Sequence, residues 1–353
     1  MQLSSRPSSL VLDLHQNKFL TPWSDPADPQ ILFPIQPLEQ LLVQLGWPDP
    51  QAWLIHWQKR GGISLKRPFW HPSTRTDWIW GLGLPLLTLV EGCLGKSDRS
   101  LLGITGLPGC GKTSLGCWLE AAAGELGWPI KVISLDDFYW PFPELDRSMS
   151  GNPWRVPRAL PGSHDLDLLA SVLDTWQSTG HLKAPMFDKA LRHGRGDRDG
   201  WHLSDPKVLV IEGWILGCLP CKFAEAGQFS DQLVPPLNKL EHDYRLVVQE
   251  ALNGYVPIWD RLDTLWHLKA IDPSSTRIWK ANQESLMQLN RGVCLDQESF
   301  EGFVRMILAS IPLTCLDGIE ADVVATLTPA RQLMWVGQRG YQDSSSSSDS
   351  CIG

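Results

Sequence analysis

The stretch Leu101-Leu102-Gly103-Ile104-Thr105, followed by Gly106-Leu107-Pro108-Gly109-Cys110-Gly111-Lys112-Thr113-Ser114, decides the fold of this chain. Its first part is a short apolar run, which is typical of a buried strand. The stretch from Gly106 to Thr113 matches the pattern G-x-x-x-x-G-K-[ST]. In such a loop, glycine lets backbone N–H groups converge on phosphate oxygens, and the N-terminus of the next helix attracts the same anion. The sequence therefore predicts a phosphate-binding loop between a strand and a helix.

The segments after this loop complete a strand–helix–strand unit. We expect a helix over Lys112–Leu126, ended by Gly127, and a second strand over Ile130–Leu135. This order implies a parallel sheet with a right-handed crossover. The predicted fold class is α/β, a three-layer α/β/α arrangement around a parallel sheet. Further strands are expected over Lys207–Ile211, Thr264–Ile271 and Ala321–Leu327, and further helices over Asp167–Trp176, Leu237–Asn253, Ser274–Leu289 and Gln297–Ile311.

The chain has 353 residues, a net charge of −8 and 43% hydrophobic residues, which favours a folded protein of about two domains. We expect a phosphate-loop domain over residues 99–335, with an insertion at about 140–205. A Ser-rich tail over 336–353 is expected to be disordered. Residues 1–98 are interpreted as a helical N-terminal extension, with helical spacing in Leu38–Leu45, Ala52–Trp57 and Trp78–Leu94.

Charge and composition exclude several classes of protein. The negative balance argues against a general nucleic-acid binder, which is usually basic over its binding domain. No apolar run reaches the roughly 20 residues that a membrane-spanning helix needs. The 8 Cys are scattered and do not form the dense framework of a small secreted domain. We therefore expect a soluble cytoplasmic protein with reduced thiols, no membrane partner and no nucleic-acid partner.

Carboxylates follow two of the predicted strands. Asp136 and Asp137 follow the second strand, and Glu212 follows the strand at Lys207–Ile211. The carboxyl edge of a parallel strand faces the ligand crevice of such a fold. Phosphoryl transfer needs a carboxylate to orient the attacking hydroxyl, together with Mg²⁺ and lysine to neutralise the phosphoryl oxygens. The alternative for Asp136 and Asp137 is a solvated or helix-capping pair, and for Glu212 a plain strand-end carboxylate.

The motifs around these strands carry a family resemblance. Together with the phosphate loop and the strand-end carboxylates they resemble the phosphoribulokinase, uridine kinase and pantothenate kinase branch of P-loop small-molecule kinases. Over about residues 100–335 they resemble, more narrowly, D-glycerate 3-kinases of the plant and cyanobacterial type. The segments that narrow the resemblance are Arg158–Asp165 (RALPGSHD), Phe187–Lys189 (FDK), Gly194–Arg198 (GRGDR), Glu212–Gly217 (EGWILG), Asn238–Glu241 (NKLE) and Trp279–Glu284 (WKANQE).

The resemblance implies ATP-dependent phosphorylation of D-glycerate to 3-phosphoglycerate, a step of photorespiratory carbon recovery, with ATP and Mg²⁺ bound at the phosphate loop. By motif position it implies Asp136 as catalytic base, with Lys112 and Glu212 as further catalytic residues. It implies Thr113, Glu212 and Asp136 as metal ligands and residues 106–114 as the nucleotide-binding loop. The implied substrate-binding residues are Asp137, Tyr139, Arg158, His164, Asp165, Lys189, Arg195 and Arg198, and the implied lid, at about 274–295, carries Arg277 and Lys280.

The residues themselves support an acidic acceptor. Arg158, His164, Lys189, Arg195 and Arg198 lie in the insertion of a chain that is negative as a whole. Arginine is enriched where carboxylates are bound bidentately, as a glycerate pocket requires. Each charge taken alone is equally well a solvated loop charge, and His164 is equally well a structural core residue.

The chain departs from the family pattern at three positions. Ala159 replaces a usual Gly, Met186 precedes Phe-Asp-Lys, and Lys280 stands where Arg is common. The first two bear on loop shape. Lysine lacks the planar fork of arginine, so the lid contact at Lys280 differs from that of the family, and Arg277 is a substitute one turn away.

Other functions stay open at this point. The acceptor is alternatively uridine, pantothenate or ribulose 5-phosphate, or the chain is a regulatory NTPase that acts through partner binding. A GTPase is disfavoured, because the segment Asn238–Glu241 ends in Glu and follows prolines instead of a strand. The Cys218-x-x-Cys221 pair lacks a second pair for zinc and is interpreted as structural. Cys110 lies at a helix N-terminus, which predicts a lowered thiol pKa and inhibition by alkylation. The oligomeric state is not predicted.

Overall fold

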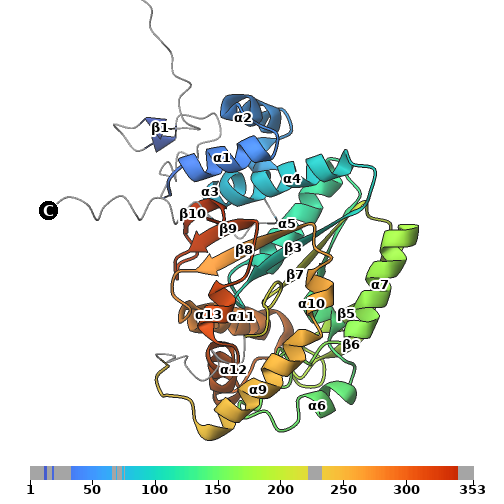
Figure 1. Ribbon diagram of the computed structural model, residues 1–353, viewed down its shortest axis with the longest axis vertical. Coiled ribbons are helices and arrows are strands. Elements are labelled where there is room, and N and C mark those ends of the chain that lie inside the picture. Colours follow the sequence, from blue (N-terminus) through green and yellow to red (C-terminus); the bar gives the residue numbers. More distant parts are fainter. Residues whose placement is uncertain are drawn as a thin grey trace, which may run out of the picture.

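The computed structural model describes residues 12–13, 18–19, 33–65, 69, 74, 76–221 and 233–340. At its centre is a six-stranded sheet in the order β10-β9-β8-β3-β7-β4. All strands run parallel except β10, which is antiparallel to β9. The predicted α/β fold with a mostly parallel sheet is therefore confirmed (Figure 1). The bounds are β3 (Ser100–Gly106), β4 (Ile130–Ser134), β7 (Val208–Gly213), β8 (Thr264–Ala270), β9 (Val323–Leu327) and β10 (Leu333–Gln338).

The position of β7 differs from the simplest expectation for the strand–helix–strand unit. β3 and β4 belong to one sheet, but β7 lies between them and pairs with both in parallel. The residues explain the order, because every residue of β7 is buried while β4 is mostly half-buried. A strand that is apolar on both faces is most stable in the interior of a covered parallel sheet. The less apolar strand takes the edge.

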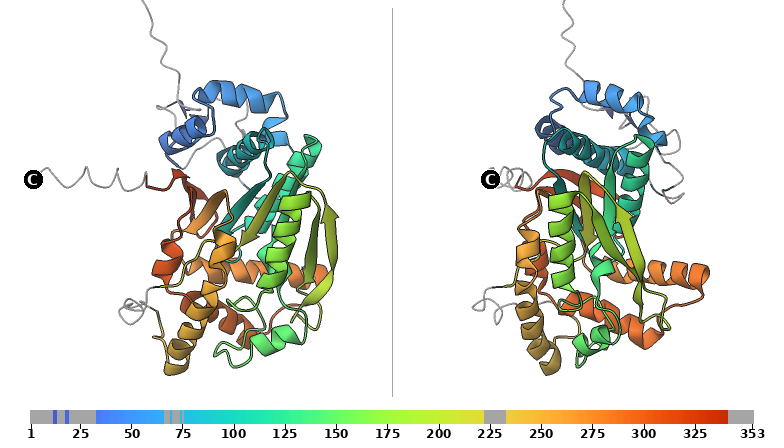
Figure 2. Two further views of the ribbon diagram at one scale, coloured as in Figure 1. Left: turned by 45° about the vertical axis from the view of Figure 1, so that its right-hand side comes forward. Right: turned by 90° about the vertical axis from the view of Figure 1, so that its right-hand side faces the viewer.

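Helices cover both faces of this sheet, which gives the expected three layers (Figure 2). On one face lie α4 (Leu84–Leu94) and α5 (Lys112–Glu125), and on the other α7 (Leu166–Thr179) and α10 (Val256–Trp259). At the carboxyl end of the strands, α11 (Ser275–Arg291) packs against α12 (Gln297–Ala309) and, through Trp279, against the phosphate loop. The remaining helices of this part are α6 (Glu144–Ser148), α9 (Lys239–Asn253), α13 (Leu313–Asp317) and the 3-10 turn η4 (Leu135–Phe138).

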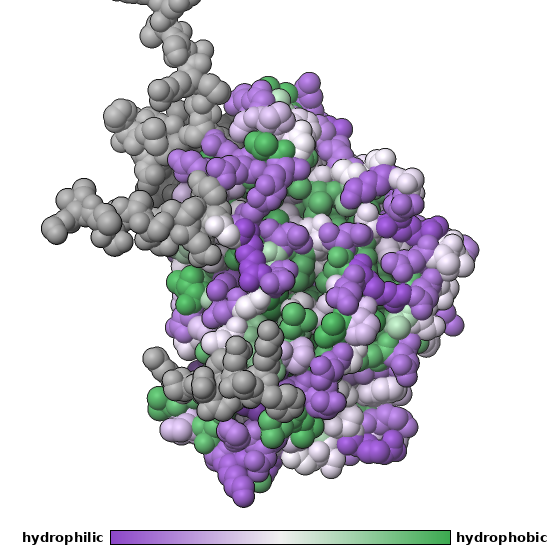
Figure 3. Space-filling model, viewed as in Figure 1, coloured by the Kyte–Doolittle hydropathy of each residue, from purple (hydrophilic) through white to green (hydrophobic). Residues whose placement is uncertain are grey.

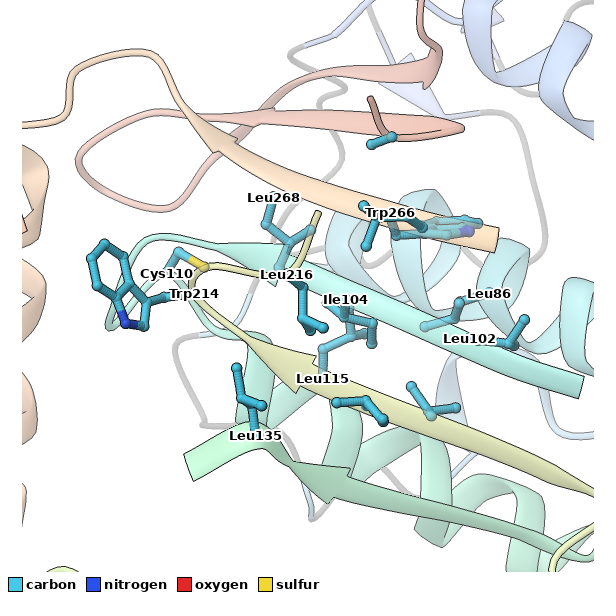
Figure 4. Packing of buried hydrophobic residues seen from close by; sticks show 14 of the residues in the cluster. Leu86, Leu102, Ile104, Cys110, Leu115, Leu135, Trp214, Leu216, Trp266 and Leu268 are labelled. Atoms are coloured by element: carbon cyan, nitrogen blue, oxygen red, sulfur yellow. The ribbon is translucent and has the colours of Figure 1, made fainter. Parts of the chain in front are cut away.

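The buried side chains form one core between these layers. Every residue of β3 is buried, so this strand is packed on both of its faces; Leu102 and Ile104 are 0% and 1% exposed. Figure 4 shows them along β3, among other leucines of the same cluster. On the surface drawn in Figure 3, hydrophobic residues are scattered among hydrophilic ones. No helix among the described residues is long and apolar enough to cross a bilayer.

The N-terminal helices share this core. Trp53 and Trp57 are fully buried, and the indole N–H of each donates to the hydroxyl of Thr88 in α4, at 2.8 and 3.0 Å. Helix α1 packs on β10, the edge strand at the other side of the sheet from β4. The described elements of residues 1–98 are β1 (Leu12–Asp13), β2 (Lys18–Phe19), α1 (Gln36–Gln44), α2 (Pro50–Gln58), η1 (Gly62–Ser64), α3 (Thr76–Trp78), the π-helical turn η3 (Ile79–Gly83) and α4.

The helix expected over Trp78–Leu94 is interrupted by the π-helical turn η3. Its glycines explain the position of this turn. A Cβ atom at Gly83 would lie 2.6 Å from the ring of Trp118, and one at Gly81 would lie 3.0 Å from the ring of Phe33. Glycine therefore lets the backbone approach two aromatic rings at once, at the place where a π-turn shifts the register of the helix.

The insertion contains a two-stranded antiparallel sheet that the sequence did not predict. Its strands are β5 (Leu182–Asp188) and β6 (Asp197–Ser204). β6 has the sequence DRDGWHLS and no buried residue, so the apolar alternation that marks a half-buried strand is absent. β5 lies against η4, which brings the end of β5 close to Asp136.

The structure differs from two further expectations, on the C-terminal domain boundary and on the state of the thiols. The boundary expected at residue 335 falls inside β10, which continues to Gln338, and the rest of the tail from residue 341 lies outside the described residues. The expectation of reduced thiols is wrong for one pair, because Cys221 and Cys315 form a disulfide. They are 94 residues apart in sequence, and only the fold brings their Cα atoms to 6.4 Å. Cys218 is buried and outside this bond.

Candidate active site

A cavity of about 820 Å³ opens at the carboxyl ends of β3, β4 and β7. This is the edge at which open α/β sheets bind ligands. Its wall includes Lys112 and Thr113 of the phosphate loop, Asp136 after β4 and Glu212 of β7. The register of the three strands explains why these side chains lie close together, because Glu212 of β7 lies opposite both Ile104 of β3 and Ser134 of β4.

The phosphate loop has the backbone that its glycines predict. Gly109 and Gly111 have φ of +80° and +117°, and a Cβ at Gly109 would lie 2.6 Å from Cβ of Trp279. These positions therefore need glycine for both conformation and space. The ammonium of Lys112 donates to the carbonyls of Gly106 and Leu107, at 2.7 and 3.2 Å. A phosphate that enters the loop offers Lys112 charged oxygens in place of these neutral carbonyls.

Thr113 and Glu212, two of the predicted metal ligands, lie together in the wall. The hydroxyl of Thr113 donates to Oε1 of Glu212 at 2.8 Å, and Glu212 is 4% exposed. Both offer hard oxygen ligands, and Mg²⁺ prefers one or two carboxylates together with the phosphates of a substrate. The described residues contain no cluster of three or more His, Cys, Asp or Glu around a metal position. The chemistry of this pair fits a Mg²⁺ ion that is held together with the phosphates of a nucleotide.

Asp136 stands at the centre of a charged hydrogen-bond network. Its Oδ2 accepts from Nζ of Lys189 at 2.6 Å, and its Oδ1 accepts from the hydroxyl of Tyr139 at 2.7 Å. Burial works against ionisation of this carboxyl, but the charge and hydrogen bond of Lys189 outweigh it and hold the pKa of Asp136 well below its usual range. Asp136 is therefore ionised at neutral pH and lines the cavity beside the lysine.

Two further cations line the same part of the cavity. Arg158 is 5% exposed, and its Nη1 donates to the carbonyls of Gly194 and Arg195 at 2.7 and 2.8 Å. Lys280 of α11 pairs with Glu284 at 2.6 Å and lies over the ring of Phe303. Burial lowers the pKa of both groups. A buried cation that faces a cavity is stabilised by an anionic ligand.

Nine of the predicted site residues do not line this cavity: Gly106, Leu107 and Cys110 of the phosphate loop, and six of the predicted substrate-binding and lid residues. Asp137 accepts from the backbone N–H of Ser134 and Phe187, and burial raises its pKa to about 6. Asp165 caps α7 and pairs with Arg198 at 2.9 Å, while Arg195 pairs with Asp146 and Arg277 with Glu301. His164 is 2% exposed and stacks on the ring of Tyr139. These contacts join segments of the insertion to one another and, through Arg277 and Glu301, α11 to α12.

His164 is held in its neutral form. The hydroxyl of Tyr255 accepts from the backbone N–H of Gly162, and because its own proton also needs an acceptor, we assign it as the donor to Nδ1 of His164, at 2.7 Å. Burial lowers the pKa of His164 to about 4. Because this is below the unfolded value of 6.5, the stability that His164 contributes is present above pH 6.5 and is lost as the pH falls through 4.

We expect His164→Phe to reduce the fall in Tm between pH 7 and pH 4, because phenylalanine keeps a ring against Tyr139 and does not titrate. At pH 7 the variant should be less stable by about 1–3 kcal/mol, because Tyr255 loses its acceptor. Thermal unfolding across this pH range measures both effects. The exposed His242→Phe serves as control and should follow the wild type; an unchanged pH profile of the Tm in His164→Phe would contradict the assignment.

Among the residues of the wall that were not predicted as site residues are Trp78 and Arg331. Trp78 comes from the N-terminal extension, and Arg331 from the turn between β9 and β10. Neither lies in a recognisable motif, and the only local signal is the φ of +58° at Arg331, which a sequence does not reveal. The predicted lowering of the thiol pKa of Cys110 is wrong. This thiol is fully buried, and burial raises its pKa against the nearby charge of Lys112.

Comparison with known proteins agrees with this geometry. No protein-family model matches the chain. It is 28% identical to a kinase of Schizosaccharomyces pombe, described only as an uncharacterized kinase, over 57% of this chain and 76% of that protein. It is also 28% identical to the chloroplastic D-glycerate 3-kinase of Arabidopsis thaliana, over 59% of this chain but only 46% of that protein.

Among solved structures, the D-glycerate 3-kinase of Cryptococcus neoformans superposes with a TM-score of 0.58 at 21% identity, over 85% of this chain and 99% of that one. The chain has the fold of a P-loop kinase. At this identity the superposition speaks for the fold alone. The sequence relatives are kinases as well, so the comparisons support an ATP-dependent P-loop kinase with a small-molecule acceptor.

Proposed function

We propose that this P-loop kinase transfers the γ-phosphoryl group of ATP to D-glycerate and forms 3-phosphoglycerate. The observation that carries the proposal is the group of cations beside Asp136. Arg158 and Lys189 line the cavity where the acceptor hydroxyl must meet the phosphoryl group. An acceptor with a carboxylate next to its hydroxyls complements this wall. The similarity to the Arabidopsis D-glycerate 3-kinase supports the same acceptor.

In the proposed mechanism the glycerate hydroxyl oxygen bonds to the γ-phosphorus as the bond to the β–γ bridging oxygen breaks. Asp136 accepts a hydrogen bond from the hydroxyl and then its proton. Lys112 moves from the carbonyls of Gly106 and Leu107 to the phosphate oxygens. When bound, Mg²⁺ on Thr113 and Glu212 supplies neutralisation of phosphate charge. Because phosphoryl transfer depends mainly on position and electrostatics, these contacts carry most of the catalysis.

The low pKa of Asp136 indicates at which stage of the proposed reaction this carboxylate accepts a proton. A strongly ionised carboxylate is a weak base, so Asp136 acts first by orientation and accepts the proton when the bond to phosphorus is well advanced. Lys189 holds the carboxylate in place and is itself positioned to attract the acceptor carboxylate. Arg158, whose Nη1 is fixed by two carbonyls, offers the rest of its guanidinium to the same group.

The acceptor is tested by ADP release with ATP, Mg²⁺ and a panel of D-glycerate, L-glycerate, uridine, pantothenate and ribulose 5-phosphate. We expect turnover with D-glycerate and a loss of at least tenfold in kcat/KM for each other acceptor. Arg158→Met should raise the KM for D-glycerate by roughly 10- to 100-fold, since a charged hydrogen bond contributes about 1.5–3 kcal/mol. Uridine as the best acceptor would refute the proposal, because its ring carries no carboxylate.

A further inference from the structure

The wall of the cavity has a part that the proposed reaction does not use. Trp78 and Arg331 line it, and the hydrogen bonds that their side chains donate run to the carbonyls of Arg331 and Gly109. Both side chains therefore lie against the phosphate loop. Trp78 belongs to the N-terminal extension, which lies outside the stretch of the family resemblance.

The two side chains are held in place by a chain of contacts. The indole N–H of Trp78 donates to the carbonyl of Arg331 at 2.6 Å, and Nε of Arg331 donates to the carbonyl of Gly109 at 2.8 Å. The guanidinium carbon of Arg331 lies 5.6 Å from the centre of the Trp279 ring. The indole also reaches the loop itself, since a Cβ at Gly111 would lie 2.9 Å from its ring. An indole and a guanidinium are thus fixed beside the phosphate loop.

The direction of the nucleotide follows from the chemistry of transfer. The γ-phosphate must face Asp136, because the acceptor hydroxyl attacks there. The base of a nucleoside triphosphate lies at the other end of its phosphate chain, so it lies on the side of the loop away from Asp136. Trp78 and Arg331 form the part of the cavity wall that lies against Gly109 and Gly111.

We propose that Trp78 and Arg331 bind the base of the nucleotide, so that the N-terminal extension completes the nucleotide site. Aromatic rings and guanidinium planes both stack on nucleobases. The inference rests on the proposed function only in that the phosphate loop binds a nucleoside triphosphate. It does not depend on which acceptor is phosphorylated.

The test compares a ligand with a base and a ligand without one. ADP and inorganic tripolyphosphate are titrated by calorimetry into the wild type, Trp78→Leu and Trp78→Phe, each as the full chain. Loss of one stacking contact should weaken ADP binding about 5- to 100-fold in Trp78→Leu. Tripolyphosphate binding should change less than about twofold, and Trp78→Phe should restore most of the ADP affinity.

Trp80→Leu is the matched control. Trp80 is two residues along the same helical segment and 3% exposed, but it packs against Phe33 and does not line the cavity. We expect it to leave both affinities unchanged. Equal loss of ADP and tripolyphosphate binding in Trp78→Leu would overturn the proposal, because it would make Trp78 a support of the phosphate loop. Unchanged ADP binding in Trp78→Leu, or equal weakening by Trp80→Leu, would also overturn it.

These outcomes are separate from the failure of the proposed function. ADP binding is measured without an acceptor, so a wild type that rejects D-glycerate leaves the result for Trp78 unaffected. Conversely, a base that binds elsewhere leaves the acceptor panel unaffected. Only a wild type that binds neither ADP nor tripolyphosphate contradicts both proposals, and it does so through the phosphate loop.

Discussion

Replacement of Asp136 by Asn should lower kcat by about 10²- to 10⁴-fold, the range in which a positioned acid or base contributes. Asparagine keeps the size of the side chain and a hydrogen bond from Tyr139, but it neither accepts a proton nor pairs with the charge of Lys189. The affinity for ADP should stay within about threefold of the wild type. Single-turnover kinetics with bound ATP separates the chemical step from product release.

The control for this prediction is Asp146→Asn. Asp146 is an exposed carboxylate of the same insertion that pairs with Arg195 and does not line the cavity. It should keep the rate of the wild type. An Asp136→Asn variant that retained more than about a third of kcat would remove Asp136 from the reaction and leave the pair with Lys189 as a structural ion pair.

Lys112→Met should lower kcat by roughly 10²- to 10³-fold, as expected for the loss of one preorganised charge at the transferring group. Methionine has a similar length and fits the apolar part of the lysine site, so the loop should keep its backbone. We expect the affinity for ADP to fall much less than kcat, because the loop N–H groups still bind phosphate. Steady-state kinetics with calorimetric ADP binding measures both quantities.

Lys183→Met tests whether loss of any lysine has this effect. Lys183 lies on β5 over the ring of Trp201, away from the residues of the cavity wall. It should leave kcat unchanged. If Lys112→Met weakened ADP binding and raised the KM for ATP but left kcat unchanged, Lys112 would act in ground-state binding alone, and the predicted role in stabilising the transferring group would be wrong.

The parts of the fold that the sequence predicts are those with strong local signals. The phosphate loop, the strand before it and helix α5 are specified by glycines, an apolar run and a helix stop within a few residues of one another. The positions of Asp136 and Glu212 follow from strand ends, because parallel strands bring their carboxyl ends to one edge. For these residues the local sequence and the tertiary structure agree.

The parts that the sequence does not predict depend on contacts between distant segments. Arg195 and Arg198 have the charge of ligand-binding residues, but Asp146 and Asp165 are near enough in the fold to pair with them. Trp78 gains its place in the cavity through the carbonyl of a residue 253 positions away. No property of a single segment shows which distant residue it will contact. Charge alone therefore assigns Arg195 and Arg198 wrongly to the acceptor site, and it does not find Trp78 in the cavity wall.

The place of β7 between β3 and β4 also limits the order in which the central sheet can assemble. A growing chain that has left the ribosome only as far as β4 holds the phosphate loop but has a gap in its sheet, where β7 later inserts. Glu212 lies on β7. The pairing of β3 with β7 joins residues that are about a hundred positions apart in the sequence. Distant contacts of this kind are slow to form. Glu212 is thus the last of the strand-end carboxylates to be synthesised, and a ligand that binds only the completed sheet edge favours the assembled sheet by mass action.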